Sequence, residues 1–247
     1  MPTPLIVGNW KMNGLSADLD QARILAEALA QSPTPVRVGL CPAATLTSRM
    51  TQMLAGTPVA VGGQDCRAEA AGAFTGDISA EMLADAGASL VIVGHSERRA
   101  GHGESDADVA AKALAAVRAG LEPIICVGET LTERQAGRAL EVVTGQVQGS
   151  VPPALSGTPF VVAYEPVWAI GTGLTPSLPE IEEMHTAIRI TLRMLFGETA
   201  AMPILYGGSV KPDNAREILS AAEVGGALVG GASLKAADFL RIIEAAG

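Results

Sequence analysis

Glu165 stands where an apolar run meets a loop, a position from which a carboxylate can do chemistry. The run Val161–Ala163 is typical of a strand buried on both faces, and Pro166 ends regular strand pairing because it has no backbone N–H. The loop Val167–Gly173 begins with large apolar residues and has small ones at its crest, a composition suited to closing over a ligand. A Glu-Pro pair by itself is most often only a turn, so the rest of the chain must decide.

His95 and Lys11 supply complementary groups. His95 precedes the segment 96–99, Ser-Glu-Arg-Arg, which is typical of a first helical turn, and a helix amino terminus disfavours a cationic imidazole. A neutral ring can donate a hydrogen bond, although a lone histidine at a strand end is more often structural. Lys11, with Asn9 nearby, offers a cation for developing negative charge, and burial under the loop would make Glu165 more basic.

Two glycine pairs, Gly207-Gly208 and Gly230-Gly231, follow apolar runs. Free N–H groups at such turns, aided by a helix dipole, make an anion site, commonly for phosphate in barrels of parallel strands. Either pair alone is equally well explained as a tight turn that needs glycine for a positive φ. Taken with a base, an acid and a cation, the pairs favour proton abstraction beside a carbonyl in a small phosphorylated substrate, giving an enediolate.

The secondary structure that positions these residues can be predicted from the spacing of apolar residues, which alternates along the chain between a pattern typical of strands and one typical of helices. The predicted strands are Leu5–Trp10, Val36–Cys41, Val59–Gln64, Leu90–Gly94, Glu122–Val127, Phe160–Tyr164, Pro203–Tyr206 and Ala227–Val229. Helical periodicity spans Leu19–Leu29, Leu46–Leu54, Met82–Ala86, Val109–Val117, Leu140–Val147, Ile181–Leu195, Ile218–Leu219 and Phe239–Ile243. Thr130 with Glu133 and Ser177 with Glu180 have capping-box spacing, Pro212 suits a first helical turn, and Gly120 suits a helix exit.

Repeated strand–helix pairs without a linker predict an α/β fold, one (β/α)₈ barrel domain over residues 1–247, with its active site at the carboxyl ends of the strands. A doubly wound open sheet is the alternative. The formal net charge of −9 argues against nucleic acid or an anionic membrane as partner. No apolar run approaches the ~18 residues of a membrane span, and no basic leader precedes the first strand, so we expect a soluble, cytoplasmic protein.

Other motifs are missing from the sequence, which narrows the chemistry. We find no GxxxxGK[ST], no complete GxGxxG after a strand, no HExxH and no GxSxG. The three histidines, His95, His102 and His185, are too dispersed to suggest a metal cluster, so we expect an enzyme that works without metal. His102 is interpreted as a surface residue. Cys41, Cys66 and Cys126 are expected to be reduced packing residues.

Seven motifs, in order, give the chain a close resemblance to the triosephosphate isomerase family. They are Val7–Asn13, Gly72–Ser79, Val93–Arg99, Cys126–Glu129, Ala163–Gly173, Tyr206–Val210 and Leu228–Ser233. The resemblance implies a TIM barrel that interconverts dihydroxyacetone phosphate and D-glyceraldehyde 3-phosphate without cofactor, in glycolysis and gluconeogenesis.

The resemblance also assigns roles. Glu165 matches the base, His95 the neutral electrophile, and Lys11 and Asn9 the groups that face the substrate oxygens. Backbone N–H groups of Gly171, Ser209, Gly230 and Gly231 match the phosphate site, with Gly171 joining only when the loop closes. Glu97 matches a carboxylate behind the lysine, less firmly, since it could equally serve a structural ion pair. Thr75, in the loop Gly72–Ser79, matches a residue that reaches the partner's site in a homodimer.

The chain departs from the family at two places, Leu174-Thr175-Pro176 and Gly101-His102-Gly103-Glu104, which bear on loop mechanics and local packing rather than on the chemistry. Two further readings remain open. Another phosphate-binding barrel enzyme, such as a pentose-phosphate epimerase, would need different residues at strands one, four and six. A barrel that merely binds a sugar phosphate, as a sensor or structural protein, would not need both Glu165 and His95.

Overall fold

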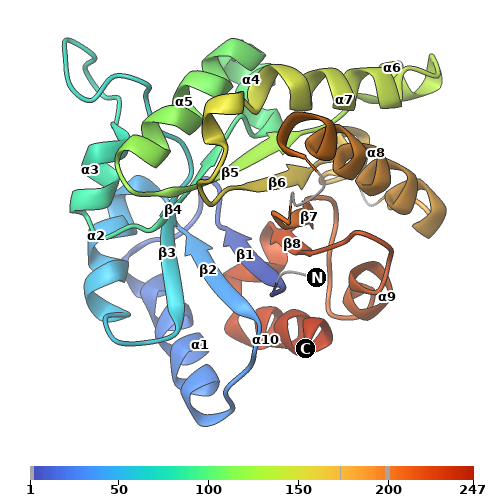
Figure 1. Cartoon of the computed structure of the whole chain (residues 1–247). Helices are drawn as coiled ribbons and strands as arrows, with labels where there is room; N and C mark the ends of the chain where they lie inside the picture. Colours follow the sequence, from blue (N-terminus) through green and yellow to red (C-terminus); the bar gives the residue numbers. More distant parts are fainter. Residues whose placement is uncertain (1–2, 173, 198–200) are drawn as a thin grey trace.

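Eight parallel strands close into a barrel in the computed structural model, which describes residues 3–172, 174–197 and 201–247 (Figure 1). The strands are β1 (Leu5–Asn9), β2 (Arg37–Cys41), β3 (Val59–Gly63), β4 (Leu90–Val93), β5 (Glu122–Val127), β6 (Val161–Tyr164), β7 (Ile204–Tyr206) and β8 (Gly226–Val229). Each end lies within one residue of the end predicted from the sequence. Because β1 pairs with β8, from Leu5 opposite Gly226 to Gly8 opposite Val229, the open-sheet alternative is wrong.

Helices surround the barrel and connect its strands. They are α1 (Leu19–Gln31), α2 (Ala44–Met53), α3 (Ala80–Asp85), α4 (Ser96–His102), α5 (Asp106–Arg118), α6 (Leu131–Gln135), α7 (Ala139–Ser150), α8 (Leu178–Phe196), α9 (Ala215–Leu219) and α10 (Ala236–Ala246). Short 3₁₀ turns lie at η1 (Ser16–Asp18), η2 (Pro153–Leu155), η3 (Val167–Ala169) and η4 (Gly231–Leu234). Each predicted helical segment corresponds to one helix. The short helices α4 and α6 were not among the predicted segments, because their apolar residues show no helical spacing.

The predicted helix signals are confirmed with one exception. Capping boxes begin α6 at Thr130 and α8 at Ser177, and Gly120 follows α5 with a φ of 80°. Pro212 does not lie in a first helical turn, because α9 begins only at Ala215. The side chain of Asn214 accepts a hydrogen bond from the N–H of Lys211 at 2.7 Å, which closes a separate turn before the helix.

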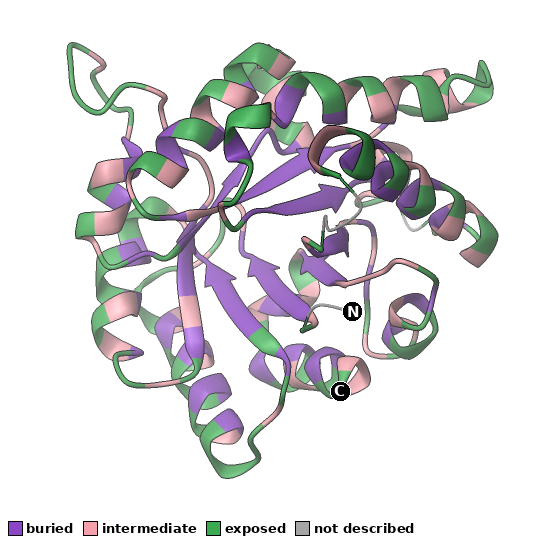
Figure 2. Cartoon of the chain, viewed as in Figure 1, coloured by how far each residue is buried: buried purple, intermediate pink, exposed green. Residues whose placement is uncertain are grey.

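Alternation along the strands divides the apolar residues between two cores. Leu5 and Val7 of β1 and Val161 and Ala163 of β6 point into the barrel, whereas their neighbours face the helices. Figure 2 shows the result: the strands are mostly buried, apart from an exposed residue at the start of β2 and intermediate residues in β3 and β5, and the helices are buried along the side that faces the barrel. Continued by two residues, the same alternation turns Asn9 and Glu165 inward at the carboxyl ends of their strands.

The connection between β3 and α3 projects away from the barrel (Figure 1). Its base is closed by a bridge between Arg67 and Ser79 and by an ion pair of 2.6 Å between Arg67 and Asp77. The guanidinium of Arg67 lies 3.7 Å from the centre of the Phe74 ring, and Thr75 at the tip is exposed. In the described part of the chain, no helix is long and apolar enough to span a membrane.

Candidate active site

A cavity of about 690 Å³ opens at the carboxyl ends of the strands. It brings together eight residues that the sequence singled out: Asn9, Lys11, His95, Glu97, Gly171, Ser209, Gly230 and Gly231. They lie at the carboxyl end of β1 or in the segments that follow β1, β4, β6, β7 and β8, so the closed barrel gathers them from distant parts of the chain. This is the end of such a barrel at which active sites form.

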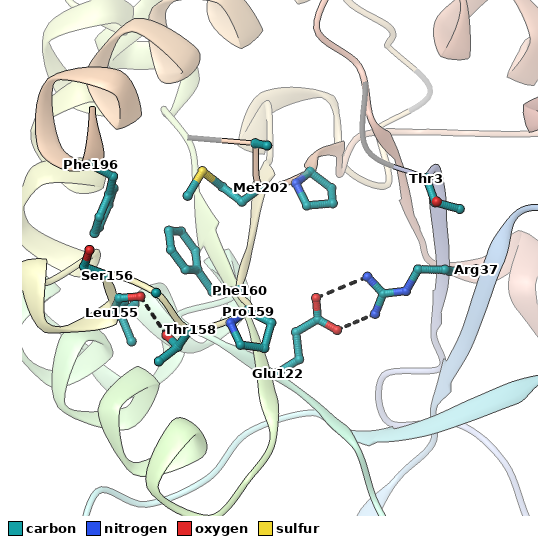
Figure 3. A pocket seen from close by; sticks show the side chains of 13 residues that line it. Thr3, Arg37, Glu122, Leu155, Ser156, Thr158, Pro159, Phe160, Phe196 and Met202 are labelled. Atoms are coloured by element: carbon teal, nitrogen blue, oxygen red, sulfur yellow. Dashed lines mark hydrogen bonds and ion pairs between the residues drawn. The ribbon is translucent and has the colours of Figure 1, made fainter. Parts of the chain in front are cut away.

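A second cavity, of about 630 Å³, lies at the opposite end of the barrel, at the amino ends of β2 and β5 (Figure 3). Phe160, Phe196 and Met202 line one part of it, and the charged side chains present, Arg37 and Glu122, are bonded to each other. No predicted site residue lies there. The chemistry therefore belongs to the first cavity.

The Glu165 carboxylate is turned toward α4 and does not line the main cavity. Its Oε2 accepts a hydrogen bond from the N–H of Ser96 at 2.9 Å, and its Oε1 accepts one from the Ser96 hydroxyl at 3.0 Å. The residue is 1% exposed. These donors fix the buried Glu165 carboxylate in one orientation. To face the cavity, the carboxylate must break both hydrogen bonds with Ser96.

His95 connects Glu165 to the cavity. Its Nδ1 accepts a hydrogen bond from the N–H of Glu97 at 3.2 Å, which a ring protonated at Nδ1 could not do. The proton of the neutral ring is therefore on Nε2, which lies 2.9 Å from Oε1 of Glu165. Because His95 is the N-cap of α4, the helix amino terminus also acts against a positive charge on this ring.

The two side chains shift each other's pKa. Burial raises the pKa of the Glu165 carboxyl, but His95 and the Ser96 donors outweigh burial and hold the pKa below its usual value. Burial lowers the pKa of His95, but the facing Glu165 carboxylate outweighs it and raises the pKa. The expectation that burial would make Glu165 more basic is thus wrong for this arrangement, because the sequence did not show that two donors would face the carboxylate.

Lys11 is held in a strained conformation at the cavity wall. Its φ is 52°, which is uncommon for a residue with a side chain, and its backbone is fixed by two contacts: its N–H donates to Asn9 Oδ1 at 3.0 Å, and its carbonyl accepts from Gln64 Nε2 at 2.8 Å. Its ammonium lies 2.6 Å from Oε1 of Glu97. These contacts place one cation near His95, and backbone strain at such a point is typical of a functional site.

The two glycine pairs differ in how much space surrounds them. A Cβ on Gly207 would lie 2.9 Å from Cγ of Glu165, and one on Gly208 would lie 2.2 Å from the Tyr206 hydroxyl, so the protein itself requires glycine there. A Cβ on Gly230 would approach only Lys11, at 3.6 Å, and one on Gly231 would meet nothing within 4 Å. None of these four has a positive φ, so the simple-turn explanation is wrong. The space at Gly230 and Gly231 lies open to the cavity.

Comparison with known proteins agrees with this geometry. The family model for triosephosphate isomerase matches residues 4–246. The chain is 62% identical over 245 residues to the triosephosphate isomerase of Caulobacter vibrioides, a match that covers 99% of this chain and 97% of that protein. The chain belongs to the triosephosphate isomerase family. It is also 59% identical to the enzyme of Ruegeria pomeroyi over 247 residues, covering 99% of this chain and 98% of that one.

A solved triosephosphate isomerase, from Bartonella henselae, has the same fold, with a TM-score of 0.92 and 47% identity over 98% of both chains. The chain is thus an isomerase built on a TIM barrel, as the sequence predicted. A metal is not suggested by its donors: within the described ranges, no three His, Cys, Asp or Glu side chains form a cluster that could hold one.

The loop Val167–Gly173, which the sequence predicts to close over a ligand, is joined to the barrel through Glu129. This carboxylate, which lies in the matched motif Cys126–Glu129, is fully buried, and its Oε1 accepts hydrogen bonds from Trp168 Nε1 at 2.8 Å and from the Tyr164 hydroxyl at 3.1 Å. The Ser209 hydroxyl donates to the carbonyl of Ala169 at 2.9 Å, which joins the loop to the turn after β7. The loop as predicted ends at Gly173, which lies outside the described residues. Beyond it, Leu174 is 52% exposed and Pro176 is buried.

Some residues at the site had no separate signal in the sequence. Ser96 was noted only as a neighbour of His95, and its role as donor to Glu165 depends on the contact between the ends of β4 and β6. Asn13, Lys211 and Arg241 line the cavity although no motif argument selected them for it. Thr75 lies apart from the cavity of its own chain, on the projecting loop. His102 is exposed and the three cysteines are buried and free, as expected.

Proposed function

We propose that this protein interconverts dihydroxyacetone phosphate and D-glyceraldehyde 3-phosphate through an enediolate, in glycolysis and gluconeogenesis. The observation that carries the proposal is the pairing of Glu165 with a His95 ring whose proton is on Nε2, beside a cavity that also contains Lys11. Proton abstraction from carbon needs a base, and the oxygen that becomes negative needs a donor and a cation.

Glu165 takes the proton from the hydroxyl-bearing carbon of the ketone, and the electron pair moves to the carbonyl oxygen to form the enediolate. The Nε2–H of His95 donates to that oxygen and exchanges protons between the two oxygens, while Lys11 and Asn9 stabilise the negative charge. Glu165 then returns its proton to the neighbouring carbon, giving the aldehyde. On leaving Ser96 the carboxylate loses the donors that lower its pKa, so it becomes a stronger base where it is used.

The phosphate lies against the turns of Ser209, Gly230 and Gly231. The open space at the two glycines favours this placement, as does Ser209, whose N–H has no acceptor within the part of the chain that the structure describes. Gly171, which has a φ of 70° and lines the same cavity, adds its N–H when the loop closes. Closure excludes water and so protects the enediolate.

The working form is a homodimer in the cytoplasm. On the projecting loop, Thr75 is exposed and the Phe74 ring is covered by the Arg67 guanidinium. In the segment after β1, Met12 is 96% exposed and Leu15 is 77% exposed. These two side chains form an apolar surface that the projecting loop of a partner would cover. Thr75 would then stand close to the partner's Asn9 and Lys11 and hold them in place.

A coupled assay with glyceraldehyde 3-phosphate tests the proposal directly. The purified chain should convert it to dihydroxyacetone phosphate without added metal or cofactor, at a rate that saturates with substrate. A chain that binds inorganic phosphate but shows no turnover would be a sensor or structural barrel, and the proposed activity would be wrong.

A further inference from the structure

Beyond the glycine turns, the wall of the active-site cavity is charged. Lys211 and Asp213, from the segment between β7 and α9, and Asp238 and Arg241, from α10, line the same cavity as the predicted phosphate site. Arg241 is paired with Asp213 at 3.1 Å between Nη2 and Oδ1. Lys11, which also lines the cavity, is paired with Glu97.

Lys211 differs from these cations. In the described ranges, its ammonium has no carboxylate partner, and the residue is exposed. Its backbone N–H donates to Oδ1 of Asn214 at 2.7 Å, and the Asn214 amide donates to the carbonyl of Ser209 at 3.1 Å. The backbone of Lys211 is therefore fixed to the turn of Ser209, while its charged end is free to meet a ligand at the cavity mouth.

A phosphorylated substrate meets an unfavourable field as it approaches. The chain carries a formal net charge of −9, and the groups proposed to hold the phosphate are neutral backbone N–H groups. Local charges at the mouth of a cleft can reverse such a field and raise the rate of encounter. The charge that does so must be near the phosphate site and not already neutralised by a partner.

We propose that Lys211 is a steering residue, which attracts the phosphate dianion to the mouth of the cavity before the Ser209 and Gly231 turns take it. The proposal rests on the proposed function only in that the substrate carries a phosphate. Asp213 opposes the effect, because it adds a negative charge at the same mouth and pairs with Arg241. Lys211 touches no reacting atom and leaves the chemical step unchanged.

The test compares kcat/KM for glyceraldehyde 3-phosphate over a range of ionic strength. Lys211→Met should lower kcat/KM about two- to fivefold at ~10 mM ionic strength, where charges act over roughly 30 Å, with kcat unchanged. At ~1 M, where charges act over roughly 3 Å, the difference should nearly vanish. Asp213→Asn should change kcat/KM in the opposite direction, with the same dependence on salt.

Two controls make the same change in net charge away from the cavity. Arg138→Met, at the N-cap of α7, matches Lys211→Met, and Glu244→Gln, near the end of α10, matches Asp213→Asn. Neither control residue lines the cavity, so both variants should stay close to wild type. If Arg138→Met lowers kcat/KM as much as Lys211→Met, or if the loss in Lys211→Met is independent of salt or lies in kcat, the proposal is overturned.

Binding of inorganic phosphate, measured by calorimetry at low and high salt, separates this proposal from the proposed function. Lys211→Met should bind inorganic phosphate more weakly than wild type at low salt and equally at high salt. That result would support the steering role even if the wild-type chain had no isomerase activity. Unchanged phosphate binding at low salt would overturn the steering role even in an active enzyme.

Discussion

Nε2 of His95 lies 2.9 Å from Oε1 of Glu165. The proposed acid of the reaction, His95, and the proposed base, Glu165, are therefore hydrogen-bonded to each other. The Glu165 carboxylate is also held by Ser96, away from the cavity. Substrate must therefore compete with the enzyme's own groups for both residues. The resting contact keeps the buried carboxylate satisfied, and turning it toward the substrate exchanges these bonds for catalytic ones.

Glu165→Gln should remove most of the turnover. An amide cannot take a proton from carbon, and a single general base contributes about 10²–10⁴-fold, so kcat should fall at least about a hundredfold, or ~3 kcal/mol in barrier. Inorganic phosphate should still bind with an affinity close to that of wild type, because separate backbone groups hold it. Steady-state kinetics and calorimetry measure the two quantities. Turnover within tenfold of wild type would exclude Glu165 as the base.

Ser96→Ala should move the acid limb of the kcat/KM profile to higher pH. The limb reports ionisation in the free enzyme, and the Ser96 hydroxyl is one of the donors that hold the pKa of Glu165 below its usual value. The backbone N–H of Ser96 remains, so the shift should be partial. Ser48→Ala, an exposed serine on α2, is a matched control that should leave the profile in place. An unchanged acid limb in Ser96→Ala would contradict the assigned contact.

Thr75→Arg should separate the proposed dimer and lower activity with it. A long cation at the tip of the projecting loop cannot enter a pocket that fits threonine without a partner for its charge. Thr132→Arg, in the exposed first turn of α6, makes the same change elsewhere and should remain a dimer. Sedimentation velocity gives the assembly and the coupled assay gives the activity. A monomeric Thr75→Arg protein with full activity would refute the proposed dependence on assembly.

His185 should make the fold sensitive to acid. The pKa of this ring is lowered to about 4, chiefly by burial and also by the nearby Arg189. The carbonyl of Glu223, 3.2 Å from Nδ1, and the Glu223 carboxylate oppose this lowering. In the unfolded chain the pKa is near 6.5, so below that pH the unfolded state binds a proton that the folded state does not. The contribution of this residue is therefore fully present above pH ~6.5 and is lost as the pH falls toward about 4, up to ~3 kcal/mol.

Urea unfolding at a fixed protein concentration, repeated between pH 7 and pH 4, measures this loss. His185→Gln removes the titrating ring and should flatten the decline in the free energy of unfolding over that range, although its stability at pH 7 should be lower. His102→Gln, at an exposed position on α4, is the control and should follow the wild-type curve. A wild-type decline that persists unchanged in His185→Gln would show that other groups cause it.

Local pattern alone determined much of this protein. Alternating periodicities of strand and helix predicted every strand to within one residue at each end, because burial on a strand or along one helix face is set by neighbours in the sequence. The same logic placed Asn9 and Glu165 at strand ends. Pro212 was assigned wrongly, since the competing turn depends on one side-chain contact of Asn214.

Tertiary structure decided the relations between distant segments. Pairing of β4 and β6 with opposite sides of β5 brings the carboxyl ends of β4 and β6 close together, and with them Ser96, His95 and Glu165. The direction of the Glu165 pKa shift therefore could not be deduced from burial alone. The open space at Gly231, and a Lys211 ammonium without a carboxylate partner among the described residues, likewise appear only once the loops after β7 and β8 meet. Coulombic and hydrogen-bond interactions depend on distances of a few ångströms between residues far apart in the chain, and those distances are fixed only when the barrel closes.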